Sequence, residues 1–342
     1  MTSEGRDLAA VVLAAGLGTR MKSRIVKVLH PLAGRPMIAW VLNAVRGVGA
    51  NRIVCVVGHQ RERVRDAVAG EPSVEFAIQD EPLGTGHALQ SASPALAGFD
   101  GDVLVCCGDT PLVTEGTLRE IVEVHRRHDA PATMLVAELA DPTGYGRVVM
   151  DERGYVERIV EERDADPAIR ARRIINTGVY CFRWSAAQPL LERLSPENVQ
   201  GERYLTDVMV MFAEGGTPSR IVELSDPGEL AGINDRLQLA AAEAVLRDRI
   251  RQRLMIEGVS FLAPETTMID DQVEIGPDTV IYPGVLIEGA SSIGEEVVIG
   301  PFSRIVDSDV GRGAELQGWN YLVRTTVPKG AILAPYFHQG AV

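Results

Sequence analysis

Small residues followed by two cations occur near the start of the chain, directly after an apolar run. Residues 11–16 read Val-Val-Leu-Ala-Ala-Gly, residues 18–21 read Gly-Thr-Arg-Met, and Lys27 lies six positions after Met21. Small side chains let the backbone approach a base and phosphates closely, while Arg20 and Lys27 supply positive charge. Met21 replaces the third glycine of the dinucleotide fingerprint, and no Gly-Lys-Ser/Thr triplet completes a P-loop. The stretch therefore predicts a phosphate-binding loop of another kind.

The segment around this loop carries positive charge only, although the chain as a whole is acidic. From Leu8 through Arg61 there are eight Lys and Arg residues and no Asp or Glu, whereas the 342-residue chain has a formal net charge of −13. A local positive field favours a small polyanion, which we interpret as a nucleoside triphosphate. Nucleic acid and anionic membranes need a broad basic surface, so neither is expected as a partner.

A carboxylate follows a second apolar run. Asp109 comes directly after residues 102–108, Asp-Val-Leu-Val-Cys-Cys-Gly. Open α/β sheets bind ligands at the carboxyl ends of their strands, and Mg²⁺ combines protein carboxylates with substrate oxygens and water. An isolated Asp after a strand is also typical of a turn or a helix cap. Taken alone, Asp109 leaves both interpretations open.

Short apolar runs rich in Val and Ile alternate with helical patterns, which predicts βαβ units and a mostly parallel sheet covered on both faces. The strand-like runs are residues 9–14, 52–57, 74–78 and 103–107. A helix is expected over residues 36–48, where apolar residues recur with helical spacing. Strand patterns over 133–184 suggest an antiparallel extension of the sheet. An Ala-, Leu- and Arg-rich segment over 226–257 predicts a linker helix.

Isoleucine recurs every six residues, seven times, between Ile269 and Ile305. This spacing is the signature of a β-helix whose flat faces each take one repeat, and seven repeats at three per coil make about two coils. The spacing fails after Ile305, so we expect residues 318–340, which are rich in aromatics, to form a cap or a subunit contact. His338 is expected outside the six-residue register. A short β-helix leaves flat faces exposed, which favours a homo-oligomer, with a trimer preferred.

The remaining composition places the chain in a reducing compartment. Cys55, Cys106, Cys107 and Cys181 lie in apolar strings without paired metal-ligand spacing, as buried thiols do. No apolar run approaches the roughly 20 residues of a membrane-spanning helix, and no signal peptide is expected. We therefore expect a cytoplasmic protein without a membrane partner.

These features resemble the sugar-1-phosphate nucleotidyltransferases, and eight further matches narrow the resemblance to the bacterial N-acetylglucosamine-1-phosphate uridyltransferase family. Besides LAAGLGTRM and KVLHPLAGRPM, the matches are Gln79, LGTGHA at Leu83–Ala88, GDTPL at Gly108–Leu112, GYGRVV at Gly144–Val149, IVEE at Ile159–Glu162, INTGVY at Ile175–Tyr180, GERYLTD at Gly201–Asp207 and GINDRLQL at Gly232–Leu239. They follow the family's order from residue 8 to about 305. One departure bears on the loop conformation, because Val26 stands where members usually place Pro before the lysine.

The resemblance implies a role for each matching residue. Uracil and ribose would be held by Leu13, Ala14, Ala15, Gly16, Gln79, Gly84 and Thr85. The triphosphate and the sugar phosphate would be bound by Arg20 and Lys27. A magnesium ion would be held by Asp109, next to Gly108 in the substrate site, and by Asn234. The sugar would contact Gly146, Glu161 and Asn176.

The resemblance also implies a fold and a reaction. The fold is α/β, with a Rossmann-like nucleotidyltransferase domain over residues 1–227, a linker helix over 228–258 and a short left-handed β-helix over 259–342. An oxygen of N-acetylglucosamine 1-phosphate attacks the α-phosphorus of UTP, giving UDP-N-acetylglucosamine and pyrophosphate for cell-envelope precursors. The nucleophile is already an anion, so catalysis requires alignment and charge screening rather than a general base.

Full-length relatives carry a longer β-helix that acetylates glucosamine 1-phosphate with acetyl-CoA. The coils that bear the catalytic histidine and the CoA contacts have no match in this sequence, so we expect acetyltransferase activity to be absent. Two other readings of the chain remain open: a pyrophosphorylase for another sugar or nucleotide, and a non-catalytic oligomeric sensor. The presence of Arg20, Lys27, Asp109 and Asn234 together argues against the sensor.

Overall fold

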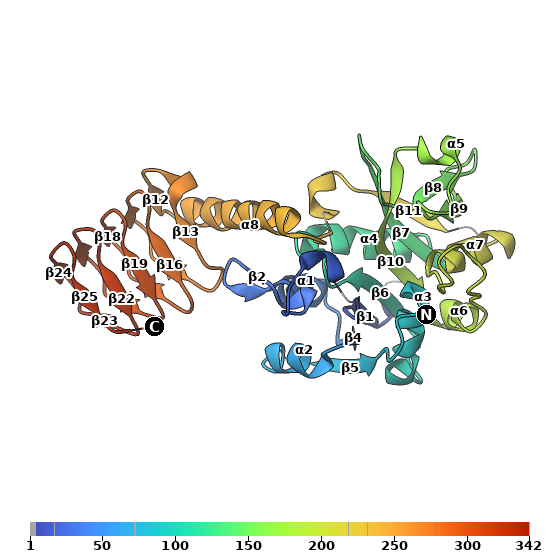
Figure 1. The fold of residues 1–342 in the computed structure, drawn as a ribbon, viewed down its shortest axis with the longest axis horizontal. Coiled ribbons are helices and arrows are strands. Elements are labelled where there is room, and N and C mark those ends of the chain that lie inside the picture. Colours follow the sequence, from blue (N-terminus) through green and yellow to red (C-terminus); the bar gives the residue numbers. More distant parts are fainter. Residues whose placement is uncertain (1–4, 17, 72, 218, 231, 342) are drawn as a thin grey trace. The chain divides into compact units, whose positions relative to one another are not determined.

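The computed structural model describes residues 5–16, 18–71, 73–217, 219–230 and 232–341. The chain forms two compact units, drawn in Figure 1: residues 1–30 with 36–238, and residues 31–35 with 239–342. The chain thus enters the second unit twice, first with the five residues 31–35 and again from residue 239 to the end.

The first unit is built on a nine-stranded sheet. Its main path runs β11-β7-β10-β6-β1-β4-β5, and β8 and β9 form a hairpin that joins β10. The strands are β1 (Leu8–Leu13), β4 (Arg52–Val57), β5 (Val74–Ile78), β6 (Asp102–Cys107), β7 (Ala132–Glu138), β8 (Arg147–Met150), β9 (Val156–Val160), β10 (Ile174–Arg183) and β11 (Arg220–Glu223). Along the main path, β10 is antiparallel to both neighbours and the other pairs are parallel. The mostly parallel sheet and the antiparallel β8–β9 addition were both predicted from the sequence.

Helices cover both faces of this sheet. They are α1 (Met37–Gly47), α2 (Arg61–Ala67), α3 (Thr85–Ser91), α4 (Glu115–Arg127), α5 (Pro167–Arg170), α6 (Trp184–Leu191) and α7 (Thr206–Glu214). Successive residues of a strand point to opposite faces. Ala10 and Val12 therefore pack with α1, α2 and α4, whereas Ala9 and Val11 pack with α3, α6 and α7. Burial on both faces explains why β1 contains no polar residue.

Three short 3-10 helices shape the loops of the first unit that bear on the site. These are η2 (Thr19–Met21), η3 (Lys27–Leu29) and η5 (Pro227–Leu230), and a fourth, η4 (Ser93–Leu96), follows α3. The expected helix over residues 226–257 is wrong in its first ten positions, because α8 begins only at Arg236 and ends at Ile256. The Asp235 carboxylate accepts the backbone N–H of Gln238, an N-cap bond that fixes this start.

The second unit consists of most of α8, the short hairpin segment and a parallel β-helix of the left-handed hexapeptide type. The hairpin pairs β2 (Pro31–Leu32) with β3 (Arg35–Pro36). Its tip belongs to the second unit: the Ala33 N–H donates to Glu243 Oε2 at 2.7 Å, and Arg35 pairs with Asp271 at 3.0 Å. These contacts attach the hairpin to α8 and to the first coil.

The β-helix has three parallel sheets, and Figure 1 shows its strands stacked coil upon coil. Its strands are β12 (Ser260–Phe261), β13 (Met268–Ile269), β14 (Glu274–Ile275), β15 (Val280–Ile281), β16 (Leu286–Glu288), β17 (Ser292–Ile293), β18 (Val298–Ile299), β19 (Arg304–Val306), β20 (Asp309–Val310), β21 (Glu315–Leu316), β22 (Tyr321–Val323), β23 (Thr326–Val327), β24 (Ile332–Leu333) and β25 (His338–Gln339), after a short turn η6 (Pro264–Thr266). All seven isoleucines of the repeat are buried, as the six-residue spacing predicts.

The prediction of about two coils is wrong, because strands continue in register to β25. The step from Ile305 to the next buried position, Val310, is five residues rather than six, and Val310 pairs with Ile293 of the preceding coil. The aromatic segment is therefore part of the β-helix rather than a cap. His338 is also inside the register, paired with Tyr321 and with its ring edge-on to it, contrary to expectation. Within the described ranges, no helix combines the length and apolarity that crossing a bilayer requires.

Candidate active site

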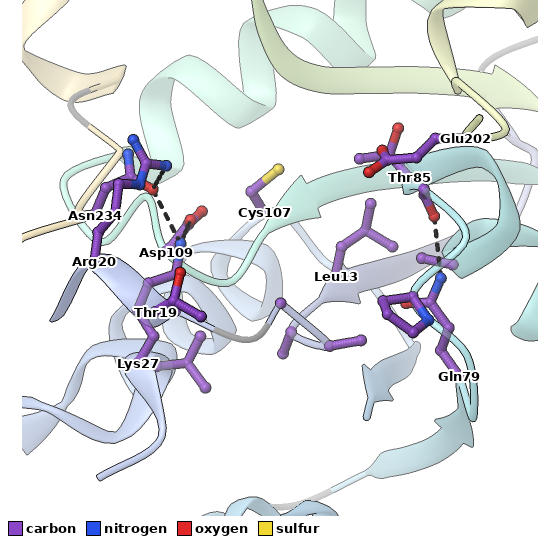
Figure 2. Close-up of a pocket in the computed structure, with 18 residues that line it drawn as sticks. Leu13, Thr19, Arg20, Lys27, Gln79, Thr85, Cys107, Asp109, Glu202 and Asn234 are labelled. Carbon is purple, nitrogen blue, oxygen red and sulfur yellow. Dashed lines mark hydrogen bonds and ion pairs between the residues drawn. The ribbon is translucent and has the colours of Figure 1, made fainter. Parts of the chain in front are cut away.

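A cavity of about 510 Å³ lies in the first unit, at the carboxyl ends of β1 and β6. It is lined by Leu13, Ala14, Ala15, Gly16, Gly18, Thr19, Arg20, Lys27, Val28, Gln79, Pro82, Gly84, Thr85, Ala88, Cys107, Asp109, Glu202 and Asn234. Figure 2 shows two distinct ends, with the charged groups around Lys27 and Asp109 on one side, Gln79 and Thr85 on the other, and Leu13 between them. We call this space the first cavity.

The backbone at Gly18 determines where Lys27 lies. Gly18 has φ +60°, a left-handed conformation, and a Cβ added to it would lie 2.5 Å from the Cβ of Lys27. Only glycine accepts both conditions without strain. The turn that follows is anchored by the buried Met21, and Val28 is buried next to Lys27. The Gly18-Thr-Arg-Met segment thus holds the lysine stem against the loop.

The departure at Val26 leaves the lysine loop in a proline-like conformation. Val26 has φ −55° and ψ 136° and directly precedes η3, which starts at Lys27. A proline ring fixes φ near −65°, so the valine already has the backbone angle that proline would impose.

The charged end of the first cavity joins one carboxylate, one amide oxygen and two cations. The Lys27 ammonium forms an ion pair with Asp109 Oδ2 and lies 3.3 Å from Asn234 Oδ1. Arg20 donates to the same Asn234 oxygen at 2.8 Å. A cation therefore already lies between the two oxygens that the resemblance assigns to a metal.

Hydrogen bonds to backbone carbonyls hold Asp109 and Asn234 in place. The Thr110 hydroxyl donates to the Cys107 carbonyl and closes the turn that carries Asp109. The Ile233 N–H donates to the Asp109 carbonyl at 2.9 Å, which links the two loops. The Asn234 amide nitrogen donates to the Gly232 carbonyl, so its oxygen faces the cations.

At the other end, Gln79 is held by its amide nitrogen. Its Nε2 donates to the Gly84 carbonyl at 3.0 Å and lies 3.1 Å from His87 Nδ1. Within the described residues no group donates to the carboxamide oxygen, which can accept a hydrogen bond from a ligand. Two backbone hydrogen bonds hold the cavity wall at this end. The Arg203 N–H donates to the Leu83 carbonyl, and the Gly86 N–H donates to the Arg203 carbonyl.

A second cavity of about 220 Å³ adjoins the first and shares Leu13, Thr85 and Cys107 with it. Its other lining residues are Gly144, Tyr145, Gly146, Glu161, Asn176, Thr177, Gly178, Tyr180, Leu205 and Thr206. A Cβ on Gly146 would lie 3.3 Å from both carboxylate oxygens of Glu161, so the glycine leaves room beside that carboxyl.

Glu161 is the acidic group of this second cavity. Burial raises the pKa of its carboxyl, and the charges of Asp164, Asp207 and Glu202 act in the same direction. The Thr206 hydroxyl donates to Glu161 Oε1 at 3.4 Å and opposes this shift. The cavity thus presents a carboxyl, from Glu161, and an amide, from Asn176, to a ligand.

Comparison with known proteins identifies the family. Residues 10–206 match the model of the MobA-like NTP transferase domain. The bifunctional protein GlmU of Geotalea uraniireducens is 45% identical over 332 residues, covering 97% of this chain and 73% of that protein. The chain belongs to the GlmU family. GlmU of Pelobacter propionicus is 46% identical over 97% of this chain and 72% of its own, and GlmU of Pelotomaculum thermopropionicum is 50% identical over 91% and 68%.

In this GlmU-family chain, the site residues expected from the sequence lie in the two cavities, with one exception. The first cavity includes Arg20, Lys27, Asp109, Asn234, Gln79, Gly84, Thr85 and residues 13–16, and the second includes Gly146, Glu161 and Asn176. Gly108 lines neither cavity. Its N–H donates to the Leu13 carbonyl at 2.8 Å, so it joins β1 to the Asp109 turn.

Sequence reasoning missed several lining residues. Thr19, Glu202, Thr206 and Tyr180 all lie inside motifs that were recognised, but none was assigned a role. Cys107 lines both cavities, and burial raises the pKa of its thiol to about 12, so it stays protonated rather than acting as a nucleophile. Its position as the last residue of a strand, two before Asp109, was the available signal.

Proposed function

We propose that this chain transfers a uridylyl group from UTP to N-acetylglucosamine 1-phosphate, forming UDP-N-acetylglucosamine and pyrophosphate for cell-envelope precursors. The observation that carries the proposal is that the two cavities share a wall and that a cationic, oxygen-rich cluster lies at one end of the first. A nucleotide and a sugar phosphate can thus lie side by side. Membership in the GlmU family supports a nucleotidyltransferase.

The Gln79 end suits uracil. With Nε2 engaged by the Gly84 carbonyl, the Gln79 oxygen can accept the N3–H of uracil. Cytosine has no hydrogen on N3, so this contact favours UTP over CTP. Leu13, Ala14, Ala15, Gly16 and Thr85 surround the same space with small or apolar groups, which fits close approach of the base and ribose to the backbone.

Arg20 and Lys27 hold the reacting phosphates. A sugar-phosphate oxygen forms a bond to the α-phosphorus of UTP, and the bond from that phosphorus to the bridging oxygen breaks as pyrophosphate leaves. Both substrates are anions, so the two cations lower their mutual repulsion and align them. The phosphate nucleophile is already deprotonated at neutral pH, so no protein group has to remove a proton.

Asp109 and Asn234 suit Mg²⁺. One carboxylate and one amide oxygen converge on the Lys27 ammonium, so a positive ion is accommodated between them. Within the described ranges, no group of three or more His, Cys, Asp or Glu side chains forms a metal site. Mg²⁺ fits such a sparse set because it completes its shell with phosphate oxygens and water. When bound, the ion would neutralise charge that develops on the phosphates.

A homotrimer and cytoplasmic location are part of the same proposal. Large side chains such as Phe302, Trp319 and Tyr336 are exposed on the β-helix, which suits association. The four cysteines are free thiols, as in a reducing compartment. Light scattering should give three times the 36.9 kDa mass of one chain, and the monomer mass would contradict the trimer.

The absence of acetyltransferase activity remains a prediction. The test is CoA release from acetyl-CoA with glucosamine 1-phosphate. We expect none, and release dependent on the added sugar would contradict the prediction.

The experiment for the main proposal mixes purified protein, UTP, Mg²⁺ and one sugar 1-phosphate and measures pyrophosphate and nucleotide sugar. N-acetylglucosamine 1-phosphate should be preferred over glucosamine 1-phosphate and glucose 1-phosphate, and addition of EDTA should stop the reaction. Preference for another sugar would keep the reaction type and replace the substrate. If none of the three sugar 1-phosphates gave pyrophosphate or nucleotide sugar, the proposal would be contradicted.

A further inference from the structure

The amide of Asn176 in the second cavity is fixed in one orientation by two donors. Its Oδ1 accepts the Gly178 N–H at 3.0 Å and the Tyr180 hydroxyl at 2.8 Å. A flipped amide would place its own NH₂ group against the Gly178 N–H, which can only donate, so the hydrogen-bond network assigns the oxygen to this side, where it also accepts from the Tyr180 hydroxyl. The NH₂ group is then the part of Asn176 that a ligand in the cavity can reach.

An irregularity in β10 brings these groups together. The register against β7 shifts between Asn176 and Tyr180, so that four steps on β10 span only two on its partner. Gly178 supplies φ +80° inside this bulge. The Thr177 hydroxyl donates to the Leu135 carbonyl at 2.7 Å and accepts the Val179 N–H, which satisfies backbone groups that the bulge removes from the ladder.

Tyr180 itself is placed by packing. Its side chain is 2% exposed, and its ring stacks on Phe182 with the centroids 5.5 Å apart. A buried tyrosine hydroxyl needs a hydrogen-bond partner, and here that partner is Asn176. Burial also raises the pKa of Tyr180 well above its ordinary value, so the hydroxyl keeps the proton that it donates.

We propose that Tyr180 is a positioning residue that makes the second cavity select sugars bearing a hydrogen-bond acceptor, by locking the Asn176 amide with its NH₂ toward the substrate. This inference rests on the proposed function. A carbonyl, such as that of an acylated amino sugar, can accept from this NH₂. An ammonium group has only hydrogens to offer and cannot. The Asn176 amide could in principle present either its oxygen or its NH₂ group to the substrate. The bulge and Tyr180 fix it so that the NH₂ group, a donor, faces the substrate.

Tyr180→Phe tests the inference because it removes the hydroxyl and keeps the stacked ring. The KM for the sugar 1-phosphate should rise about threefold to tenfold, the loss of one hydrogen bond, while the KM for UTP and the kcat change less than about twofold. Tyr155→Phe is the matched control, since Tyr155 lines neither cavity and packs under Arg220. It should leave both KM values unchanged.

A double-mutant cycle separates positioning from direct contact. In an Asn176→Ala background, adding Tyr180→Phe should have no further effect on the sugar KM, because the amide it acts through is gone. The same further rise in that background, an equal rise in both substrate KM values, or no effect of Tyr180→Phe in the wild type would each overturn the inference. If the wild type prefers another sugar 1-phosphate, the proposed function fails and the cycle is run with that sugar. If it turns over none, both fail.

Discussion

The two cavities offer a ligand different kinds of physical contact. The first places Lys27, Arg20 and Asp109 around small residues, so it acts mainly through charge. The second has one half-buried carboxyl and an oriented amide, so it offers directional hydrogen bonds. Charge attracts any polyphosphate, whereas a fixed donor or acceptor distinguishes substrates that differ by one polar group. Reaction rate should therefore depend most on the first cavity, and sugar choice on the second.

The largest effect is expected at Asp109. Asp109→Ala removes the carboxylate that pairs with Lys27, and kcat should fall at least about 10²- to 10³-fold with every sugar 1-phosphate. The fold should persist, because the aspartate backbone keeps its bond from Ile233. Pyrophosphate release and circular dichroism measure the two outcomes. Asp100→Ala, on the exposed surface, should remain fully active; near-normal turnover by a folded Asp109→Ala protein would remove this residue from the site.

Gly18→Ala should have the next largest effect. The new Cβ would strain a left-handed backbone and press on the Lys27 stem, and displacement of the lysine should lower kcat/KM for UTP about 10- to 100-fold. Gly49→Ala is a matched control, because Gly49 also has positive φ, +83°, but a Cβ there meets nothing within 4 Å. Equal losses of activity in both variants would show that backbone strain alone is responsible.

Glu161→Gln should alter stability in a pH-dependent way. The half-buried Glu161 carboxyl has a raised pKa and so favours its protonated form in the folded state; its contribution to stability is present below the ordinary pKa of 4.5 and is lost as pH rises through the raised value. Glutamine stays neutral. The Tm of the variant should therefore exceed that of the wild type by about 2–4 °C near pH 7.5, and by less near pH 5.5. Thermal melts at the two pH values check this, and a difference that shrinks with rising pH would contradict the assignment.

Val26→Pro should have the smallest effect. The valine already has φ −55°, and within the described part of the chain its N–H donates no hydrogen bond. Proline there should raise the free energy of unfolding by about 0.4–1 kcal/mol, because it lowers the conformational entropy of the unfolded chain, and it should leave turnover unchanged. Denaturant melts and steady-state rates measure both quantities. A large loss of activity would mean that the loop conformation depends on valine.

Periodicity predicted the cores better than the loops. The burial of an isoleucine at every sixth position follows from side-chain alternation. A strict six-residue pattern could not predict the five-residue step from Ile305 to Val310. The early start assigned to the long helix came from its composition, whereas the actual start depends on the Asp235 cap. The residues of the first cavity could be predicted mainly because their motifs resemble those of a known family, while Leu13 and Cys107 end the neighbouring parallel strands β1 and β6. The Asn176–Tyr180 contact could not, because it requires a register shift that only the folded sheet defines.

The most direct test of the division between the cavities is a crossed kinetic comparison of Gln79→Leu and Asn176→Ala. Gln79 donates to Gly84 in the first cavity, and Asn176 accepts from Tyr180 in the second. We predict that Gln79→Leu raises the KM for UTP about tenfold and leaves the KM for N-acetylglucosamine 1-phosphate unchanged, and that Asn176→Ala does the reverse. Equal increases in both KM values for either variant, or an exchange of the two effects, would contradict the account.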